Sequence, residues 1–266
     1  AIIINEAYLP SLIETAGYEW IETGLRKIDS LSYERPVESE SDLPDQLPKS
    51  FIVYISGIDT YGGISVRSRS DVNILAAVNT EMQQIFLAAT PRDFYVQSSA
   101  TKGQKDKLTH MGIYGVGASI DALEQLYNIK IDYYLRINFT GFVELIDALG
   151  GIEVYSDYAF SVKDIKDYQK GYNQVNGLEA LAFARERYSF ANGDYQRAKN
   201  QMEVIRAIIK KCASPAILRN YRSIMKAISG AAETNMPEDQ IEALAVKQLL
   251  MGWSWEISTY TAEGDS

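Results

Sequence analysis

The chain has 266 residues, of which 46% are hydrophobic and 23% are charged. This composition is typical of a globular protein with a sizeable core, and it excludes a disordered chain, a collagen or a disulfide scaffold. The 26 Lys and Arg residues against 35 Asp and Glu residues give a formal net charge of −9. Because nucleic acid is itself negative, we expect no nucleic acid partner.

The chain contains one cysteine, Cys212, and one histidine, His110. These are too few for an internal disulfide or a zinc site, so any bound metal is expected to have oxygen ligands. The sequence has no G-x-S-x-G nucleophile elbow and no G-x-x-x-x-G-K-[ST] motif, which argues against α/β-hydrolases and P-loop NTPases. We interpret Cys212 as a buried or half-buried bystander at the end of a helix.

The first 48 residues are predicted to form an accessory segment and linker, separate from a domain at residues 49–266. Residues 5–15 show a helical pattern, and residues 35–48 hold three of the chain's seven prolines, which is typical of a linker. No apolar run approaches the ~20 residues of a membrane-spanning helix.

Beyond residue 48, strands and helices are predicted to interleave. Strands are expected from β-rich or alternating runs at residues 51–56, 72–78, 85–89, 131–138 and 253–257. Helices are expected at residues 116–127, 142–149, 176 onward, 194–211, 215–228 and 237–250. Asn176 with Glu179 predicts a capping box, Asp194 is the expected cap of the next helix, and Gly150-Gly151 end an earlier one. This order predicts an α/β or α+β layered domain.

Charged residues are predicted to meet at one edge of the sheet. Asp59 follows the first strand, Asp71 precedes the second, and Arg92 follows the third. Residues 80–84 form a short connection typical of antiparallel neighbours, so the end of the third strand lies beside the start of the second. If the first strand pairs there too, Arg69 joins this group.

Two carboxylates beside arginines suit one chemical task in particular. Mg²⁺ takes one or two carboxylates together with phosphate oxygens and waters, and arginine binds phosphate through paired hydrogen bonds. The pattern therefore predicts a phosphate site. Spacing alone is equally compatible with strand-end carboxylates that form ion pairs with surface arginines.

A second cluster favours the phosphate site. Arg185 and Arg187 close the capped helix, and Arg197 and Gln201 lie one turn apart beside the apolar stripe of the next helix. Exposed helices of an acidic protein can carry such arginines as solvated charges. The pairing of Arg197 with Gln201 beside a buried stripe instead indicates a cleft.

Seven blocks of the sequence resemble, in order and spacing, the LytR-CpsA-Psr family, and its capsule-associated members in particular. The blocks are Ile55–Asp59, Arg69–Asp71, Ala89–Asp93, Ile131–Tyr134, Asp147–Gly151, Asn176–Arg187 and Asp194–Gln201. The resemblance is continuous over residues 50–211. It implies an α-β-α layered α/β domain with a central mixed sheet, and an apolar cavity between sheet and helices.

The resemblance also implies a function. Family members transfer a glycopolymer from a polyprenyl pyrophosphate to peptidoglycan as its sugar phosphate, on the outer face of the membrane of Gram-positive bacteria. They are held there by an N-terminal membrane helix. This chain begins at Ala1 without an initiator Met, and we expect such an anchor to precede it.

The resemblance further implies roles for individual residues. Asp59 and Asp71 would hold Mg²⁺, and one of them would take the proton of the incoming sugar hydroxyl. The pyrophosphate would be bound by Arg69, Arg92, Arg185, Arg187, Arg197 and Gln201. The apolar interior would take the prenyl tail. Gln196 and Asn200, which depart from the family pattern, are expected to affect substrate choice.

Two other functions stay open on the sequence. One is a regulatory or ligand-sensing attenuator of cell-envelope polysaccharide synthesis, and the other is a lipid pyrophosphatase that uses water as the acceptor at the same site. The polymer itself is either capsular polysaccharide or wall teichoic acid. The N-terminal segment alone favours capsular polysaccharide.

Overall fold

The computed structural model describes residues 18–21, 24–27, 47–218 and 221–262. The helix expected at residues 5–15 and most of the expected linker lie outside these residues. The boundary placed at residue 48 therefore stays a prediction. Within the described part of the chain, no helix is both long and apolar enough to cross a membrane.

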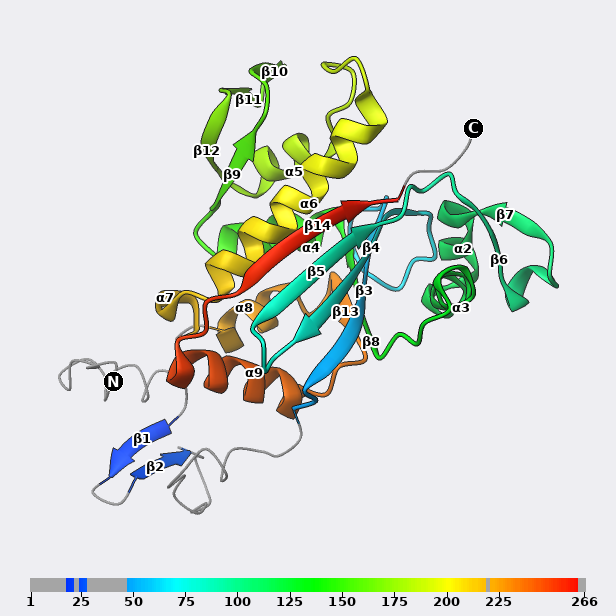
Figure 1. Cartoon of the computed structure of the whole chain (residues 1–266). Coiled ribbons are helices and arrows are strands. Elements are labelled where there is room, and N and C mark those ends of the chain that lie inside the picture. Colours follow the sequence, from blue (N-terminus) through cyan, green and yellow to red (C-terminus); the bar gives the residue numbers. More distant parts are fainter. Residues whose placement is uncertain (1–17, 22–23, 28–46, 219–220, 263–266) are drawn as a thin grey trace.

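A six-stranded mixed sheet forms the centre of the molecule (Figure 1), in the order β13-β8-β3-β4-β5-β14. Its strands are β3 (Ser50–Ile58), β4 (Ser70–Asn79), β5 (Gln84–Ala89), β8 (Tyr133–Asn138), β13 (Ala232–Thr234) and β14 (Glu256–Thr261). The β3/β8 and β5/β14 pairs are parallel, and the other pairs are antiparallel. The expected mixed sheet and the expected antiparallel pairing across residues 80–84 are both confirmed.

Both faces of the central strands are buried. Along β4, Leu75 belongs to the core on one face of the sheet, while Ile74 and Ala76 belong to the core on the other. Successive strand residues point to opposite faces, so an almost continuous apolar run fills two cores at once.

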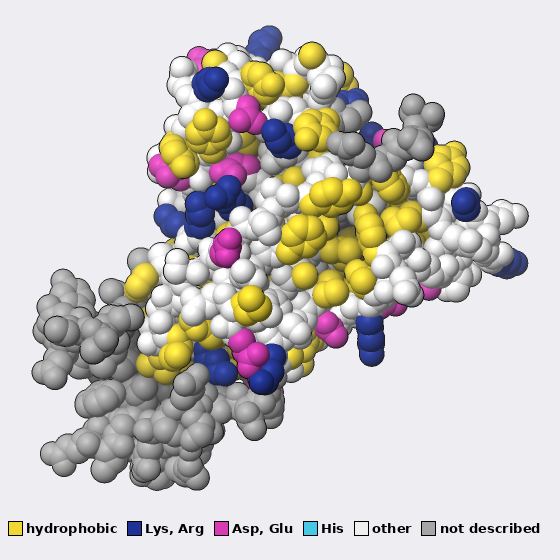
Figure 2. Space-filling view, in the orientation of Figure 1, with side chains coloured by type: hydrophobic (Ala, Val, Ile, Leu, Met, Phe, Trp, Pro, Cys, Tyr) yellow, Lys and Arg dark blue, Asp and Glu magenta, His cyan; other side chains and the backbone are white. Residues whose placement is uncertain are grey.

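Helices cover the two faces to different extents. On one face, α2 (Leu108–Tyr114) and α3 (Val116–Tyr127) pack over β3 and β4, with Leu108 and Leu123 fully buried. Figure 2 shows hydrophobic side chains gathered over β5 and β14 on this side of the molecule. There Phe86 and Tyr260 stay exposed on the sheet surface.

The other face packs against α6 (Gly193–Cys212), whose Met202 joins Leu87 in the core. A further core holds α4 (Phe139–Ala148) and α5 (Gly177–Arg185) against α6 and two ribbons, β9/β12 and β10/β11. This arrangement confirms the α-β-α layers. The ribbon strands are β9 (Ile152–Ser156), β10 (Phe160–Val162), β11 (Lys166–Tyr168) and β12 (Gly171–Val175).

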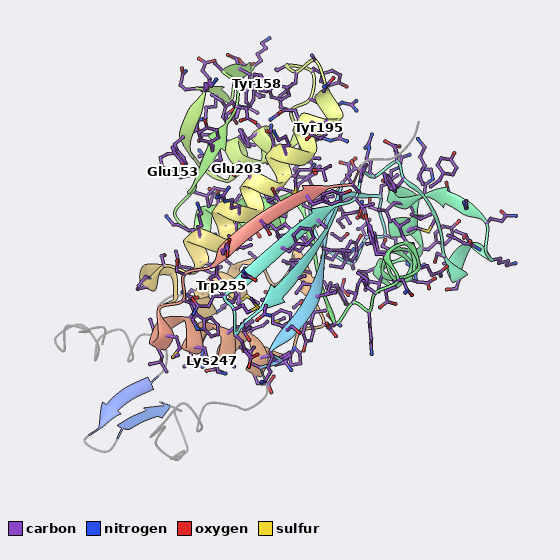
Figure 3. All side chains as sticks on the ribbon, viewed as in Figure 1. Glu153, Tyr158, Tyr195, Glu203, Lys247 and Trp255 are labelled. Carbon is purple, nitrogen blue, oxygen red and sulfur yellow. The ribbon has the colours of Figure 1, made fainter. Side chains whose placement is uncertain are left out.

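The C-terminal elements differ in detail from the expectation. The helix predicted at residues 215–228 is present as α7 (Pro215–Leu218) and α8 (Tyr221–Ile228), followed by α9 (Glu238–Met251). The last strand was predicted too early, because Trp255 (Figure 3) packs toward α9 and donates its indole N–H to Gln248 Oε1 at 2.7 Å. β14 therefore begins at Glu256 and continues to Thr261.

Several short elements had no clear sequence signal. They are β1 (Tyr18–Ile21), β2 (Gly24–Lys27), β6 (Tyr95–Gln97), η2 (Ser99–Thr101) and β7 (Lys105–Lys107). Strands of three or four residues carry too little periodicity to be recognised. The same applies to β10, β11 and β13.

Candidate functional site

A cavity of about 510 Å³ lies between the sheet and the layer of α4 and α5, within the usual size range of ligand pockets. Its lining includes most of the residues that the sequence singled out, namely Asp59, Asp71, Arg92, Arg185, Arg187, Arg197 and Gln201. Apolar residues complete the wall, among them Ile58, Val72, Ile137, Phe142, Leu178 and Leu181. Of the charged lining residues, Asp59 and Arg185 are exposed and the others are half-buried, while the apolar residues Ile58, Ile137 and Leu181 are buried.

Asp71 is placed by a β-bulge. Gly57 of β3 pairs with Val72 and Ile58 pairs with Ser70, so Asp71 has no partner on β3. A bulge turns a side chain away from the regular alternation of a strand. Gly57 is needed opposite the bulge, because a Cβ there would lie 2.9 Å from the Val72 side chain. The sequence placed Asp71 before the strand, whereas it lies inside β4.

Two donors fix the Asp71 carboxylate. Arg92 Nη1 donates to Oδ2 at 3.0 Å, and Thr109 Oγ1 donates to Oδ1 at 3.1 Å. The Thr109 backbone N–H also donates to the Arg92 carbonyl at 2.8 Å. Thr109 thus ties the carboxylate and its arginine together from α2.

A close backbone approach brings α2 to this position. A Cβ on Gly112, one turn after Thr109, would lie 2.6 Å from the Ser68 carbonyl oxygen and 2.7 Å from the Ser70 nitrogen. Only glycine permits this contact without a shift. α2 therefore rests directly on the segment that leads into Asp71.

Asp59 follows β3 beside the bulge, and its backbone N–H donates to the Arg69 carbonyl at 3.3 Å. Its carboxylate is exposed and makes no hydrogen bond or ion pair with the described residues. Arg69 is adjacent through its backbone, but its side chain is exposed and does not line the cavity. The predicted role of Arg69 in phosphate binding stays a prediction.

The C-terminal end of α5 delivers two arginines. The predicted capping box is confirmed: Asn176 accepts from the Glu179 backbone at 2.9 Å, and Glu179 accepts from the Asn176 backbone at 3.0 Å. Arg185 ends the helix, with its guanidinium 4.4 Å from the centre of the Phe139 ring. Arg187 follows two residues later and lies over the Tyr188 ring at 4.7 Å.

The first turns of α6 supply Arg197 and Gln201. Gln201 Nε2 donates to the Ala184 carbonyl at 3.4 Å. The pKa of the Asp93 carboxyl is lowered, mainly by the hydrogen bond from Lys107. The positive charges of Arg92 and Arg197 also lower it, which places Arg197 near Asp93. The expected cleft-facing pair on this helix is therefore present at the cavity.

The residues around this pair differ from expectation. Asn192 is the N-cap of α6, so Asp194 lies within the first turn and not at the cap. Gln196 and Asn200 are buried and hydrogen-bonded to each other at 2.9 Å, and Asn200 also binds the Phe183 carbonyl. They join α6 to α5 and do not line the cavity.

The remaining reactive side chains do not belong to the cavity. His110 pairs with Asp106 at 2.9 Å on α2. Cys212 is half-buried at the end of α6, and burial raises the pKa of its thiol to about 11. The interpretation of Cys212 as an unreactive bystander fits this environment.

Metal binding here would depend on a small donor set. No group of three or more His, Cys, Asp or Glu side chains capable of holding a metal occurs among the described residues. Two carboxylates, Asp59 and Asp71, do line the same cavity. That set fits Mg²⁺, which retains waters and takes phosphate oxygens, and does not fit a metal that needs a full protein cage.

The sequence did not indicate some residues of the site. Thr109 is one of them, because its contact with Asp71 depends on the approach of α2 to β4. Tyr61 and Tyr188 also line the cavity. Nothing in their spacing distinguishes them from the other tyrosines of the chain.

Comparison with known proteins gives a consistent result. The model of the LytR_cpsA_psr family matches residues 17–266. A curated relative from Enterococcus faecalis (strain ATCC 700802 / V583) is named polyisoprenyl-teichoic acid--peptidoglycan teichoic acid transferase TagU. It is 38% identical over 216 residues, which are 80% of this chain and 70% of the relative.

Solved structures share the fold. The crystal structure of B. subtilis TagV superposes with a TM-score of 0.70 at 29% identity, covering 82% of this chain and 85% of TagV. A structure described as TagT bound to LIIa-WTA superposes with a TM-score of 0.65 at 26% identity, covering 82% and 80%.

Proposed function

The chain belongs to the LytR_cpsA_psr family, and from that premise we propose that it is a phosphotransferase that attaches a glycopolymer to peptidoglycan. Its donor would be the polymer linked to a polyprenyl pyrophosphate. The observation that carries this proposal is that carboxylates and arginines line one cavity together with an apolar wall. The transferase name of the E. faecalis relative supports the same activity.

The two parts of the cavity match the two parts of such a donor. Four arginines, Arg92, Arg185, Arg187 and Arg197, would bind the pyrophosphate, because guanidinium groups pair with phosphate oxygens. The apolar wall formed by Ile58, Val72, Phe142 and Leu181 would take the first part of the prenyl tail. A neighbouring fold, TagT, is described as bound to LIIa-WTA.

The reaction needs positioning and neutralisation of charge more than covalent help. A sugar hydroxyl of peptidoglycan attacks the phosphorus that carries the polymer. The bond from that phosphorus to the bridging oxygen breaks, and polyprenyl monophosphate leaves. The arginines stabilise the charge that develops on the transferred group and on the leaving phosphate.

The two aspartates differ in their surroundings and therefore in the role that each can take. The oxygens of Asp71 are engaged by Arg92 and Thr109, which makes Asp71 a fixed, oriented group. The Asp59 carboxylate is exposed. Asp59 is thus the better placed of the two to accept the proton of the attacking hydroxyl.

We also assign a Mg²⁺ site to Asp59 and Asp71. When bound, the ion would neutralise negative charge on the pyrophosphate. Support comes from the donor set itself, because Asp59, just after β3, and Asp71, in the neighbouring strand β4, both line the cavity with the arginines.

The location follows from the substrates. A lipid-linked polymer and peptidoglycan meet at the outer face of the cell membrane, so we place the protein there, held by an anchor. The names of the relatives support a teichoic acid as the polymer. Capsular polysaccharide stays a prediction, since it depends on an N-terminal segment that lies largely outside the described residues.

Removal of Arg92 tests the proposal. We expect Arg92→Ala to slow transfer from a lipid-linked polymer to a peptidoglycan fragment by about 30-fold to 1,000-fold, because one desolvated phosphate contact contributes about 2–4 kcal/mol in the transition state. Transfer is measured by the appearance of polymer-bearing peptidoglycan.

Arg222→Ala is the matched control. Arg222 is exposed, pairs with Glu242 at 3.0 Å and does not line the cavity, and such surface pairs contribute little. Unchanged transfer by Arg92→Ala would contradict the proposal. Polymer phosphate released equally with and without peptidoglycan would identify a pyrophosphatase instead.

A further inference from the structure

Two tyrosines at the cavity are far more exposed than a ring of this size usually is. Tyr61 is 66% exposed and Tyr188 is 84% exposed, and both line the cavity with the arginines. Neither ring belongs to one of the apolar cores. Exposed rings that are also held in place at a pocket indicate a binding role.

Tyr61 lies in a fixed loop. The backbone N–H of Gly62 donates to Thr140 Oγ1 at 2.9 Å, and Asn138 Nδ2 donates to the Gly62 carbonyl at 2.6 Å. The Tyr61 ring meets the Phe139 ring edge to face, with centroids 5.1 Å apart. The face of Phe139 in turn carries the Arg185 guanidinium.

Tyr188 is fixed by an arginine of the same cluster. Arg187 Nη2 donates to the Tyr188 hydroxyl at 2.7 Å, and the guanidinium lies 4.7 Å from the ring centre. The turn that carries the ring is closed by the Ser189 backbone N–H, which donates to Glu186 Oε1 at 2.8 Å. One face of the ring takes a cation, and at 84% exposure the ring remains open to a further ligand.

Both tyrosines are therefore next to the arginine cluster, Tyr188 by direct contact with Arg187 and Tyr61 by contact with Phe139, whose ring carries Arg185. Both rings line the same cavity as these arginines, so a group bonded to a diphosphate held by Arg185 and Arg187 would lie in the cavity that the rings line. In the donor, the group bonded to the diphosphate on the side away from the lipid is a sugar. The C–H face of a sugar ring packs on an aromatic ring, while its hydroxyl groups stay in water.

We propose that Tyr61 and Tyr188 form a saccharide subsite at the opening of the cavity, which packs against the ring of a sugar adjacent to the diphosphate. This inference rests on the proposed function. The same chemistry would suit the sugar of the donor or that of the acceptor, and the experiment below separates the two sources. The subsite recognises the ring face, so it tolerates different sugars.

Binding of matched lipids tests the subsite. The probes are farnesyl diphosphate and farnesyl diphosphate that carries one N-acetylglucosamine, measured by calorimetry against the whole chain. We expect the sugar to tighten binding to the wild type by about threefold to tenfold, the range of a single aromatic contact. Tyr61→Ala and Tyr188→Ala should lose this gain, so that within each variant the ratio of the affinities for the two lipids falls towards one.

Two further variants sharpen the result. Tyr188→Phe keeps the ring but loses the hydroxyl that Arg187 binds, and it should keep the gain from the sugar. Tyr172→Ala removes a ring of similar exposure, 69%, on β12 outside the cavity, and it should also keep the gain.

The outcomes separate this inference from the function on which it rests. A sugar gain that survives both Ala substitutions, an equal loss for both lipids, or an equal effect of Tyr172→Ala would overturn the subsite. Failure of the wild type to bind either lipid would contradict the proposed function, and with it the subsite. An N-acetylglucosamine trisaccharide that binds without lipid and needs the same tyrosines would assign the subsite to the acceptor sugar.

Discussion

Asp71 occupies its position because β4 holds one residue more than β3 at their shared end. The extra residue, Asp71, shifts the register of β4 against β3 between Gly57 and Ile58, so Asp71 has no partner on β3. A buried network of Tyr54, Ser56 and Ser70 lies directly beneath, with Ser56 Oγ 2.8 Å from Ser70 Oγ. This hydrogen-bonded network holds the bulge in place, and the bulge keeps the Asp71 carboxylate in one orientation.

Thr109 is predicted to be a positioning residue for this carboxylate. Thr109→Val removes the hydroxyl donor with little change of shape, and a hydrogen bond to a charged group contributes about 1.5–3 kcal/mol. We expect transfer to slow by about tenfold to a hundredfold, with the larger effect on kcat and little on KM for the donor.

Thr109→Ser supplies the control, because it restores the hydroxyl and should recover most of the activity. A purely structural role would make both variants less stable to the same degree without this recovery. Equal activity of Thr109→Val and the wild type would refute the positioning role.

The structure brings most of the charged residues that side-chain chemistry and spacing singled out to one cavity, while their roles stay predictions. These residues lie at or near the ends of strands and helices, and the sequence pattern predicts where strands and helices end. They are Asp59, Asp71 and Arg92 beside the strands, and the arginines and Gln201 at α5 and α6. Thr109 could not be predicted in this way, because its contact with Asp71 spans 38 residues and depends on the glycine contact of α2. Arg69 is the opposite case. It lies two residues before Asp71 in the sequence, yet its side chain does not line the cavity.

At the scale of elements, the position of α5 decides where Arg185, one of the arginines proposed to bind phosphate, lies. The helix starts at a capping box and is packed against α4 through Gly177, where a Cβ would clash with the Val143 carbonyl oxygen. Its last residue is Arg185. A shift at the start of this helix would therefore displace the guanidinium at its end.

Gly177→Ala is predicted to destabilise the protein and to weaken donor binding. Forcing a methyl group against backbone costs about 1–3 kcal/mol or more, and denaturant unfolding measures the loss. The matched control is Gly117→Ala on α3, where a Cβ meets nothing within 4 Å. That variant should gain stability by up to about 1 kcal/mol from helix propensity.

The two variants give opposite expected signs, which makes the comparison informative. Gly177→Ala with unchanged stability and unchanged donor affinity would show that α4 and α5 adjust freely. It would also show that the contact between α4 and α5 does not position Arg185.

Element type was predictable where the apolar pattern was long, as in β4, α3 and α6. The boundaries of the elements were less predictable, because they depend on tertiary contacts that the apolar pattern of the sequence does not encode. The start of β14 is set by the hydrogen bond of Trp255 to α9. The ribbons β9/β12 and β10/β11 were missed for a related reason, since short strands are stabilised by the core beneath them and not by their own sequence.

At the scale of the whole molecule, the acidic balance and the site are compatible. The chain carries a formal net charge of −9, yet the cavity gathers four arginines with three carboxylates, Asp59, Asp71 and Glu186. The surplus of negative charge therefore lies on the rest of the surface. We expect such a surface to repel nucleic acid, while the cavity keeps a local cluster of arginines that we propose binds a diphosphate.

The layered fold also explains why one cavity can serve a substrate with two unlike ends. Strand ends and bulges place carboxylates at the edge of the sheet, and the ends of α5 and the start of α6 face them with arginines. The apolar wall continues inward from the same edge. A lipid diphosphate can therefore be bound along one continuous path.

The fate of the two phosphorus atoms tests the central claim most directly. The donor is prepared with the polymer-side phosphorus and the lipid-side phosphorus separately labelled, and it is incubated with the wild-type chain and a peptidoglycan fragment. We predict that the polymer-side phosphorus appears in the peptidoglycan product and that the lipid-side phosphorus remains as polyprenyl monophosphate. Peptidoglycan that carries polymer without that phosphorus, or no labelled peptidoglycan at all, would contradict a phosphotransferase.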